Sequence, residues 1–231
     1  MLETKRIFKM DRKIGVCAVQ IPAELQQALH DASHALSQTS SCWLIGGSCG
    51  LLLQDVHLDK PPRDIDIYAD SASVSELHHA LAGRAADQPV LSVTDQYRSV
   101  LSHYKLSRYT LELVGGFEVQ AEGSHYKVEI NRRLAPAGVH TKLNSIRIPL
   151  MPLSHELLFN VLRNREDRYT AIAAAMRADL QAHLPLLEDL LTDNAFQSEH
   201  IQIISQLLQT ESLVRFAVNG RDSGHTGRES Q

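Results

Sequence analysis

The chain has 231 residues, of which 43% are hydrophobic and 22% charged, and its formal net charge is −4. This length allows a sizeable core in one domain, or in one domain with a smaller second one, and the ordinary composition excludes a repeat array and a chain that is disordered throughout. The acidic balance lacks the basic surface of proteins that hold duplex nucleic acid, so we do not expect such a partner.

The sequence carries few targeting or redox signals. Residues 1–22 begin basic and turn apolar, but the apolar part is short and runs into a helix start, so we find no signal peptide. No stretch approaches the roughly 18 to 20 apolar residues of a membrane span. Three cysteines, Cys17, Cys42 and Cys49, without CxxC spacing favour reduced thiols and a cytoplasmic location.

The first third of the chain alternates helical and strand patterns. We predict, in order, a helix over 22–38, a buried strand over 41–47, a short helix over 48–56, a strand over 63–69 and a helix over 73–83. Ser73 and Gly83 are expected to cap the last of these helices at its two ends.

The pattern then changes twice. Stretches 90–119 and 124–134 are rich in Val, Tyr and Thr, which predicts several partly antiparallel strands, with Arg132 and Arg133 at a strand end. After a boundary near 149–152, helical spacing takes over. We therefore expect an α+β protein with a mixed sheet and flanking helices. Its predicted parts are an α/β domain over 1–150, a helical domain over 151–217 and a disordered tail over 218–231.

Two aspartates on the strand RDIDIYA are the first candidate site residues. Asp64 and Asp66 are two residues apart, so they share one strand face while Ile65 and Ile67 turn into the core. Paired carboxylates repel each other unless a cation lies between them, and Mg²⁺ prefers such oxygen ligands. An exposed strand face that carries two acids is the competing interpretation.

The glycines that end the preceding strand are the second candidate. Gly46 and Gly47 allow a close backbone approach, and the following helix start and the Ser48 hydroxyl suit a phosphate. A tight turn with a helix cap explains the same residues without a ligand. Together with the acid pair, these residues predict half of a nucleotide site.

These two motifs, LIGGSCGLLLQ followed by RDIDIYAD, resemble the signature of the DNA polymerase β-like nucleotidyltransferase superfamily. The resemblance covers roughly 43–168 and implies a mixed-sheet nucleotidyltransferase core. It also implies a third carboxylate on a later strand, for which Glu112 is the best match and Glu118 and Glu129 are the alternatives. A later helical segment is similar to one in small-molecule relatives, with Asn160 where many of them carry a lysine.

The resemblance implies transfer of a nucleoside monophosphate from a nucleoside triphosphate such as ATP to a hydroxyl of a small molecule or protein. Two Mg²⁺ ions would be held by Asp64, Asp66 and Glu112. Gly46, Gly47 and Ser48 would hold the β and γ phosphates. Arg63 or Lys60 would meet phosphate, or would instead form an ion pair with a nearby acid.

Other classes of function stay open at this point. The same fold without turnover would be a nucleotide-binding regulatory module, and an antitoxin-like protein would require a partner chain. A homo-oligomer is also compatible with the sequence. We expect the acceptor pocket at the junction between the sheet and the helical third, because ligand sites often lie at such junctions.

Overall fold

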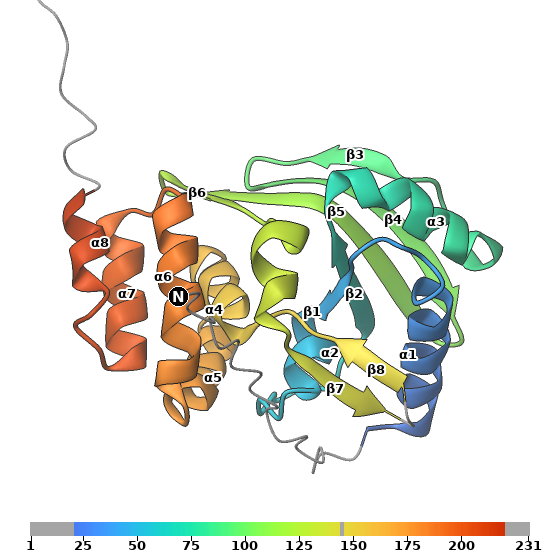
Figure 1. Cartoon of the computed structure of the whole chain (residues 1–231), viewed down its shortest axis with the longest axis horizontal. Coiled ribbons are helices and arrows are strands. Elements are labelled where there is room, and N and C mark those ends of the chain that lie inside the picture. The colour runs from blue at the N-terminus through green and yellow to red at the C-terminus, as the bar shows by residue number, and fades with distance from the viewer. Residues whose placement is uncertain (1–20, 144–145, 220–231) are drawn as a thin grey trace, which may run out of the picture.

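The computed structural model describes residues 21–143 and 146–219 (Figure 1). The helices are α1 (Ala23–Leu36), α2 (Gly47–Leu52), α3 (Val74–Leu81), α4 (Leu153–Leu162), α5 (Glu166–Arg177), α6 (Leu180–Asp193), α7 (Ser198–Leu208) and α8 (Val214–Asn219). The strands are β1 (Leu44–Gly46), β2 (Asp64–Ala69), β3 (Val90–Val93), β4 (Tyr97–Leu106), β5 (Tyr109–Ala121), β6 (Ser124–Lys127), β7 (His140–Leu143) and β8 (Ile146–Pro149).

A six-stranded mixed sheet is the centre of the molecule. Its strand order is β1-β2-β5-β4-β3, and β6 pairs with the far end of β5. Among the neighbouring strands described in this sheet, β2 and β5 run parallel and the other pairs are antiparallel. A separate hairpin joins β7 to β8. The α+β class predicted from the sequence is therefore confirmed.

Two hydrophobic clusters cover the two faces of this sheet. One lies beneath α1 and α3 and contains the fully buried Ile65 and Ile67 of β2. The other joins the opposite face to α4–α8, which stand together on one side in Figure 1. Because Ile65 and Ile67 occupy the first cluster, strand alternation places Asp64 and Asp66 together on the opposite face, as predicted. That face is the one turned toward the helices.

Two local predictions are wrong. The strand expected over 124–134 stops at Lys127, and Arg132 and Arg133 lie in a π-helical turn over Ile130–Leu134. This turn forms because the Asp70 carboxylate accepts backbone N–H groups from the start of the turn at 2.8 and 3.0 Å. These bonds take donors that a strand ladder would need.

The predicted capping of α3 is also absent. Ser73 makes no side-chain cap hydrogen bond, and Glu76 instead accepts hydrogen bonds from Ser40 and Ser41. The helix ends at Leu81 and continues as a short 3-10 turn that contains Gly83. The contact of Glu76 with a distant loop is tertiary and has no local sequence signal.

The C-terminal part begins with α4, directly after the hairpin. The tail predicted over 218–231 starts with the last two residues of α8, and residues 220–231 lie outside the described part of the chain. The division into an α/β and a helical domain stays a prediction, because the cluster on the helical face contains residues of both. Within the described ranges, no helix has the length and apolar character needed to cross a membrane.

Candidate active site

Three carboxylates from two neighbouring strands line one pocket. Asp64 and Asp66 stand on β2, and Glu112 stands on β5, where it is the register partner of Asp66. All three line a cavity of about 390 Å³ that α4 and α5 close from the other side. We call these three acids the sheet wall. The parallel pairing of β2 with β5 is what brings Glu112, 46 positions after Asp66, beside it.

The sheet wall is electrostatically strained in the absence of a cation. Burial raises the pKa of Asp66 well above its ordinary value, and the charges of Asp64 and Glu112 raise it further. The pKa of Glu112 is also raised, first by burial and then by Asp64, while His103 lowers it. The acids therefore repel one another in their ionised forms, and a nearby positive charge would relieve this repulsion.

The two alternative third carboxylates lie elsewhere. Glu118 pairs with Arg98 at 3.7 Å and with His125 at 3.2 Å, and Glu129 pairs with Arg132 at 3.1 Å. Neither lines the cavity of the sheet wall. The geometry therefore favours Glu112 as the third acid of the site.

Gly47 occupies a position at which any larger residue would have to displace its neighbours. Its φ is +57°, in the left-handed region that side chains disfavour. A Cβ atom there would also collide with Oδ2 of Asp66. The glycine turn thus lets the backbone pass directly against the second acid of the sheet wall.

The Gly47 backbone is already bonded, which changes the role predicted for the turn. Its N–H donates to Oε1 of Glu156 on α4 at 2.8 Å, so this donor is not free for a phosphate. Glu156 is only 1% exposed. Asn160, one turn later, donates to the Glu156 backbone oxygen at 2.8 Å and lines the pocket. One of the backbone N–H groups that the sequence predicted for phosphate binding is therefore already bonded to a carboxylate of α4.

Glu156 has a strongly perturbed pKa. Burial raises the pKa to about 7, while the Gly47 hydrogen bond, Arg163 and Arg168 act in the opposite direction. Its charge is thus partly compensated by groups that also line the pocket. We call the set of Glu156, Arg163, Arg165 and Arg168 the helical wall.

Three arginines supply the positive charge of the helical wall. Arg163 lies over the Phe159 ring at 4.5 Å, and Arg168 donates from Nη2 to the Ser48 hydroxyl oxygen at 3.0 Å. Arg165 donates from Nε and Nη2 to Asp167 at 3.0 and 2.9 Å. Because an arginine offers five N–H donors, each of these groups keeps donors for a ligand.

Sequence reasoning chose different cations. Arg63 is exposed and does not line the cavity of the sheet wall, so its contact with a cofactor stays a prediction that this geometry does not support. Lys60 lines a separate hollow against α5. The dense arginine run NVLRNREDR at the end of α4 was the available signal for the arginines of the helical wall. No sequence pattern indicated that Glu156 belongs to the pocket.

Aromatic rings form one end of the pocket. The Phe117 ring lies 5.8 Å from Tyr97 and 5.2 Å from Phe159, measured between centroids. Small hydroxyl side chains of Ser92 and Thr94 lie at the same cavity. This end offers a flat apolar surface with a polar rim, which suits a ring-bearing ligand.

The donor set fits a hard cation by its chemistry, although the side chains are not gathered around one point. In the described part of the chain, no three His, Cys, Asp or Glu residues lie close enough together to form a ready metal site. Asp64, Asp66 and Glu112 nevertheless share one cavity and offer only carboxylate oxygens, the ligands that Mg²⁺ prefers. Their mutual repulsion is the feature that a cation would remove.

Searches by sequence give no relative. No protein-family model matches the chain, and no curated protein matches it. Similarity is found among solved structures instead. A protein from Thermotoga maritima assigned as a nucleotidyltransferase aligns with a TM-score of 0.57 and 20% identity, over 71% of this chain and 97% of that one.

Two antibiotic-modifying proteins are similar at a lower level. The resistance factor ANT(2'')-Ia aligns with a TM-score of 0.48 and 11% identity, over 75% of this chain and 94% of its own. The lincosamide antibiotic adenylyltransferase LnuA aligns with a TM-score of 0.41 and 14% identity, over 64% and 96% of the two chains. At these identities the likeness concerns the fold. The chain thus has the DNA polymerase β-like nucleotidyltransferase fold that its two motifs predicted.

Proposed function

We propose that this protein is a nucleotidyltransferase that moves a nucleoside monophosphate from a nucleoside triphosphate to a hydroxyl group. The observation that carries the proposal is the pocket in which the three acids of the sheet wall face the three arginines of the helical wall. Acids that need a cation and arginines that bind phosphate are the two parts that phosphoryl chemistry requires. The fold shared with the Thermotoga maritima protein that is assigned as a nucleotidyltransferase supports it.

The acids have two roles in this proposal. Asp64, Asp66 and Glu112 would hold Mg²⁺, which would neutralise charge on the phosphate oxygens. Glu112 is 34% exposed, so an acceptor hydroxyl can reach its carboxylate, which would serve as the base. The acceptor oxygen bonds to the α-phosphorus, the bond to the β-phosphate breaks, pyrophosphate leaves and Glu112 takes the acceptor proton.

The helical wall would orient the triphosphate. Arg163 and Arg168 lie on the pocket side opposite the acids, and Arg168 already reaches the Ser48 hydroxyl beside the glycine turn. Bidentate guanidinium contacts suit phosphate oxygens. Gly47 would then serve mainly to let Asp66 approach the backbone, because its N–H is bonded to Glu156.

The acceptor is proposed to be a small molecule with a free hydroxyl. The cavity measures about 390 Å³ and has an aromatic end, dimensions that suit a compact ring-bearing ligand. A protein hydroxyl on an extended loop is the second acceptor class. ATP as donor and a cytoplasmic location remain predictions.

A titration tests the proposal at its first step. Each of the four nucleoside triphosphates is titrated calorimetrically into the protein with and without Mg²⁺, and then into Asp66→Asn. Glu118→Gln is the matched control, because that acid lies outside the cavity. We expect Mg²⁺-dependent binding that Asp66→Asn abolishes and Glu118→Gln retains. Absence of binding to the folded protein would contradict the proposal.

Two observations favour a second candidate, a regulatory module that binds nucleotide without turnover. The Gly47 N–H is bonded to Glu156, and the acids are not gathered around one point. Binding that is independent of Mg²⁺, with no pyrophosphate release across an acceptor panel, would support this module over the enzyme.

A further inference from the structure

The free edge of the central sheet carries an exposed apolar strand. β3 is the end strand of the sheet, and in the described part of the chain no other strand pairs with its outer side (Figure 1). Val90, Leu91 and Val93 are 60%, 58% and 62% exposed, and they make up most of the large exposed hydrophobic residues of the structure. Natural proteins usually protect such an edge with charges, a bulge or a covering element.

The backbone of β3 has unused hydrogen-bonding groups in register with these side chains. Thr94 donates its N–H to the Tyr97 oxygen at 2.8 Å, which makes this pair a bonded one. Antiparallel pairs alternate, so Ser92 is bonded to β4 and the N–H and C=O groups of Leu91 and Val93 point outward. The edge thus offers two donors and two acceptors within three residues.

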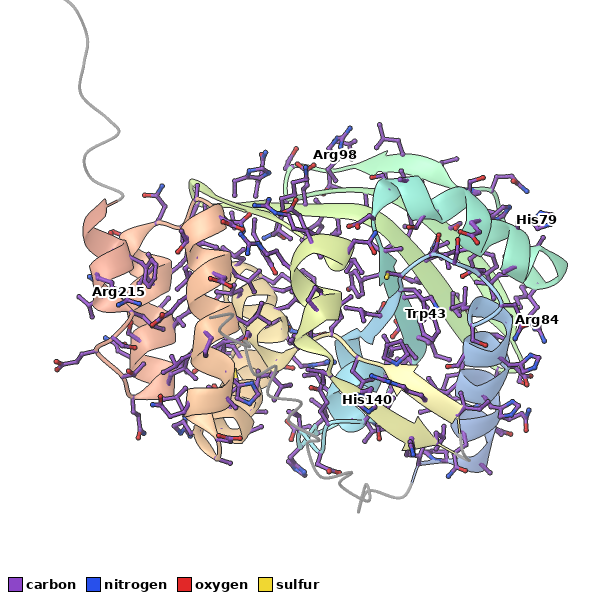
Figure 2. The ribbon with its side chains drawn as sticks, viewed as in Figure 1. Trp43, His79, Arg84, Arg98, His140 and Arg215 are labelled. Atoms are coloured by element: carbon purple, nitrogen blue, oxygen red, sulfur yellow. The ribbon has the colours of Figure 1, made fainter. Side chains whose placement is uncertain are left out.

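Charge does not oppose pairing at this edge. Residues 89–94 contain no charged side chain. Asp95 follows this stretch in the hairpin turn and, with the two edges centred on Ser92, would lie opposite the uncharged Pro89. The next charged groups have partners within the chain, since Asp87 binds His103 at 2.6 Å and Arg98 lies 3.7 Å from Glu118. Figure 2 shows Arg98 at the rim of the sheet near β3. In this arrangement no two like charges stand directly opposite each other.

We propose that β3 pairs with β3 of a second copy of this chain, antiparallel about a two-fold axis at Ser92. A two-fold axis normal to the sheet keeps each side chain on its own face, so each residue must oppose one of the same parity. Centring it on Ser92 sets Leu91 opposite Val93 of the second copy, twice. The four outward groups of each strand then form four backbone hydrogen bonds, and the two sheets become continuous.

This dimer is weak and borders the candidate active site. A four-residue strand pairing buries less surface than the roughly 1,000 Å² of a stable interface, so we expect a dissociation constant on the order of 10–100 μM. Ser92 and Thr94 also line the pocket of the sheet wall. The second copy would therefore lie beside the rim of that pocket. The inference rests on the edge geometry and does not depend on the proposed reaction.

Sedimentation velocity over a micromolar to submillimolar range tests the association. The full chain is expected to dimerise, and Val93→Lys to raise the dissociation constant at least about tenfold. Ile203→Lys is the matched control, because Ile203 is exposed on α7, away from the edge. A wild-type protein that is monomeric throughout, or dimerisation that only Ile203→Lys weakens, overturns the proposal.

Cysteine crosslinking tests the register. Ser92 would oppose itself in a non-bonded pair, with Cα atoms about 4.5 Å apart, close enough for a disulfide. Ser92→Cys should form a covalent dimer under mild oxidation. Thr94→Cys, on the same face but not opposite itself, should crosslink no more than the wild type, which controls for the native thiols. Equal crosslinking of the two variants would contradict the register.

Discussion

The sheet wall and the helical wall of the pocket have opposite electrostatic designs. The sheet wall gathers three carboxylates, and burial, followed by their mutual repulsion, raises the pKa values of Asp66 and Glu112. The helical wall contains one buried carboxylate, Glu156, accompanied by arginines that lower its pKa against the effect of burial. The negative charges of the sheet wall therefore repel one another, while the helical wall contains arginines that offset the charge of its own carboxylate.

The comparison explains why the glycine turn lies where it does. Gly47 is the point at which the two walls meet, because Asp66 fills the place of its missing side chain and Glu156 accepts its N–H. A larger residue would separate the sheet wall from the turn. Loss of Glu156 would separate the helical wall from it. Variants of the two walls and of the turn should accordingly fail in different ways.

The largest effect is expected on the sheet wall. Glu112→Gln keeps the side-chain shape and removes the negative charge, and we predict a loss of roughly 1,000-fold in kcat for nucleotidyl transfer once an acceptor is found. Thermal stability should be unchanged or higher, because a repelling charge is lost. Glu118→Gln is the control in a pyrophosphate-release assay. A variant with full turnover would remove Glu112 from the mechanism.

A substitution at Gly47, where the two walls meet, should lower the stability of the protein. Gly47→Ala forces a Cβ into the left-handed region and against Oδ2 of Asp66, which we expect to cost at least about 2 kcal/mol of unfolding free energy. Urea denaturation measures this loss. Gly83→Ala is the matched control, because a Cβ there has no neighbouring atom within 4 Å and its φ is not in the left-handed range. Equal effects of the two substitutions would contradict the tight packing at the turn.

The buried Glu156 of the helical wall should make the stability of the protein depend on pH. Since the pKa of Glu156 rises from 4.5 to about 7 on folding, the unfolded state releases this proton first, and stability falls as pH rises through that interval. Glu156→Gln keeps the acceptor for Gly47 and has no such slope. Its stability relative to the wild type should therefore increase by up to about 3 kcal/mol between pH 4.5 and 8.

Denaturant unfolding at these two pH values measures the difference, with Glu118→Gln as the control. Asp66 and Glu112 also have raised pKa values, so they contribute to the fall of stability with pH in the wild type and in Glu156→Gln alike. Only the difference between wild type and Glu156→Gln reports on the helical wall. Parallel pH profiles for the two proteins would show that Glu156 is not buried as described.

Much of the fold followed from local patterns. Alternation in β2 correctly placed Ile65 and Ile67 in the core and the two aspartates opposite them, and helical spacing found α1 and the C-terminal helices. The strand over 124–134 failed because Asp70, 60 residues before Ile130, binds the backbone there. Such a contact between distant residues leaves no mark in a local pattern.

The sequence by itself determined the acid pair, the glycine turn and the choice of strand face, since these depend on periodicity and on residues near one another in the chain. Tertiary structure decided which third acid joins the pair, because the register of β5 against β2 selects Glu112. It also placed the arginines of the helical wall, and not Arg63, at the pocket, and it gave the Gly47 N–H to Glu156, 109 residues away. Such choices follow from packing between segments, which residue spacing along one chain does not encode.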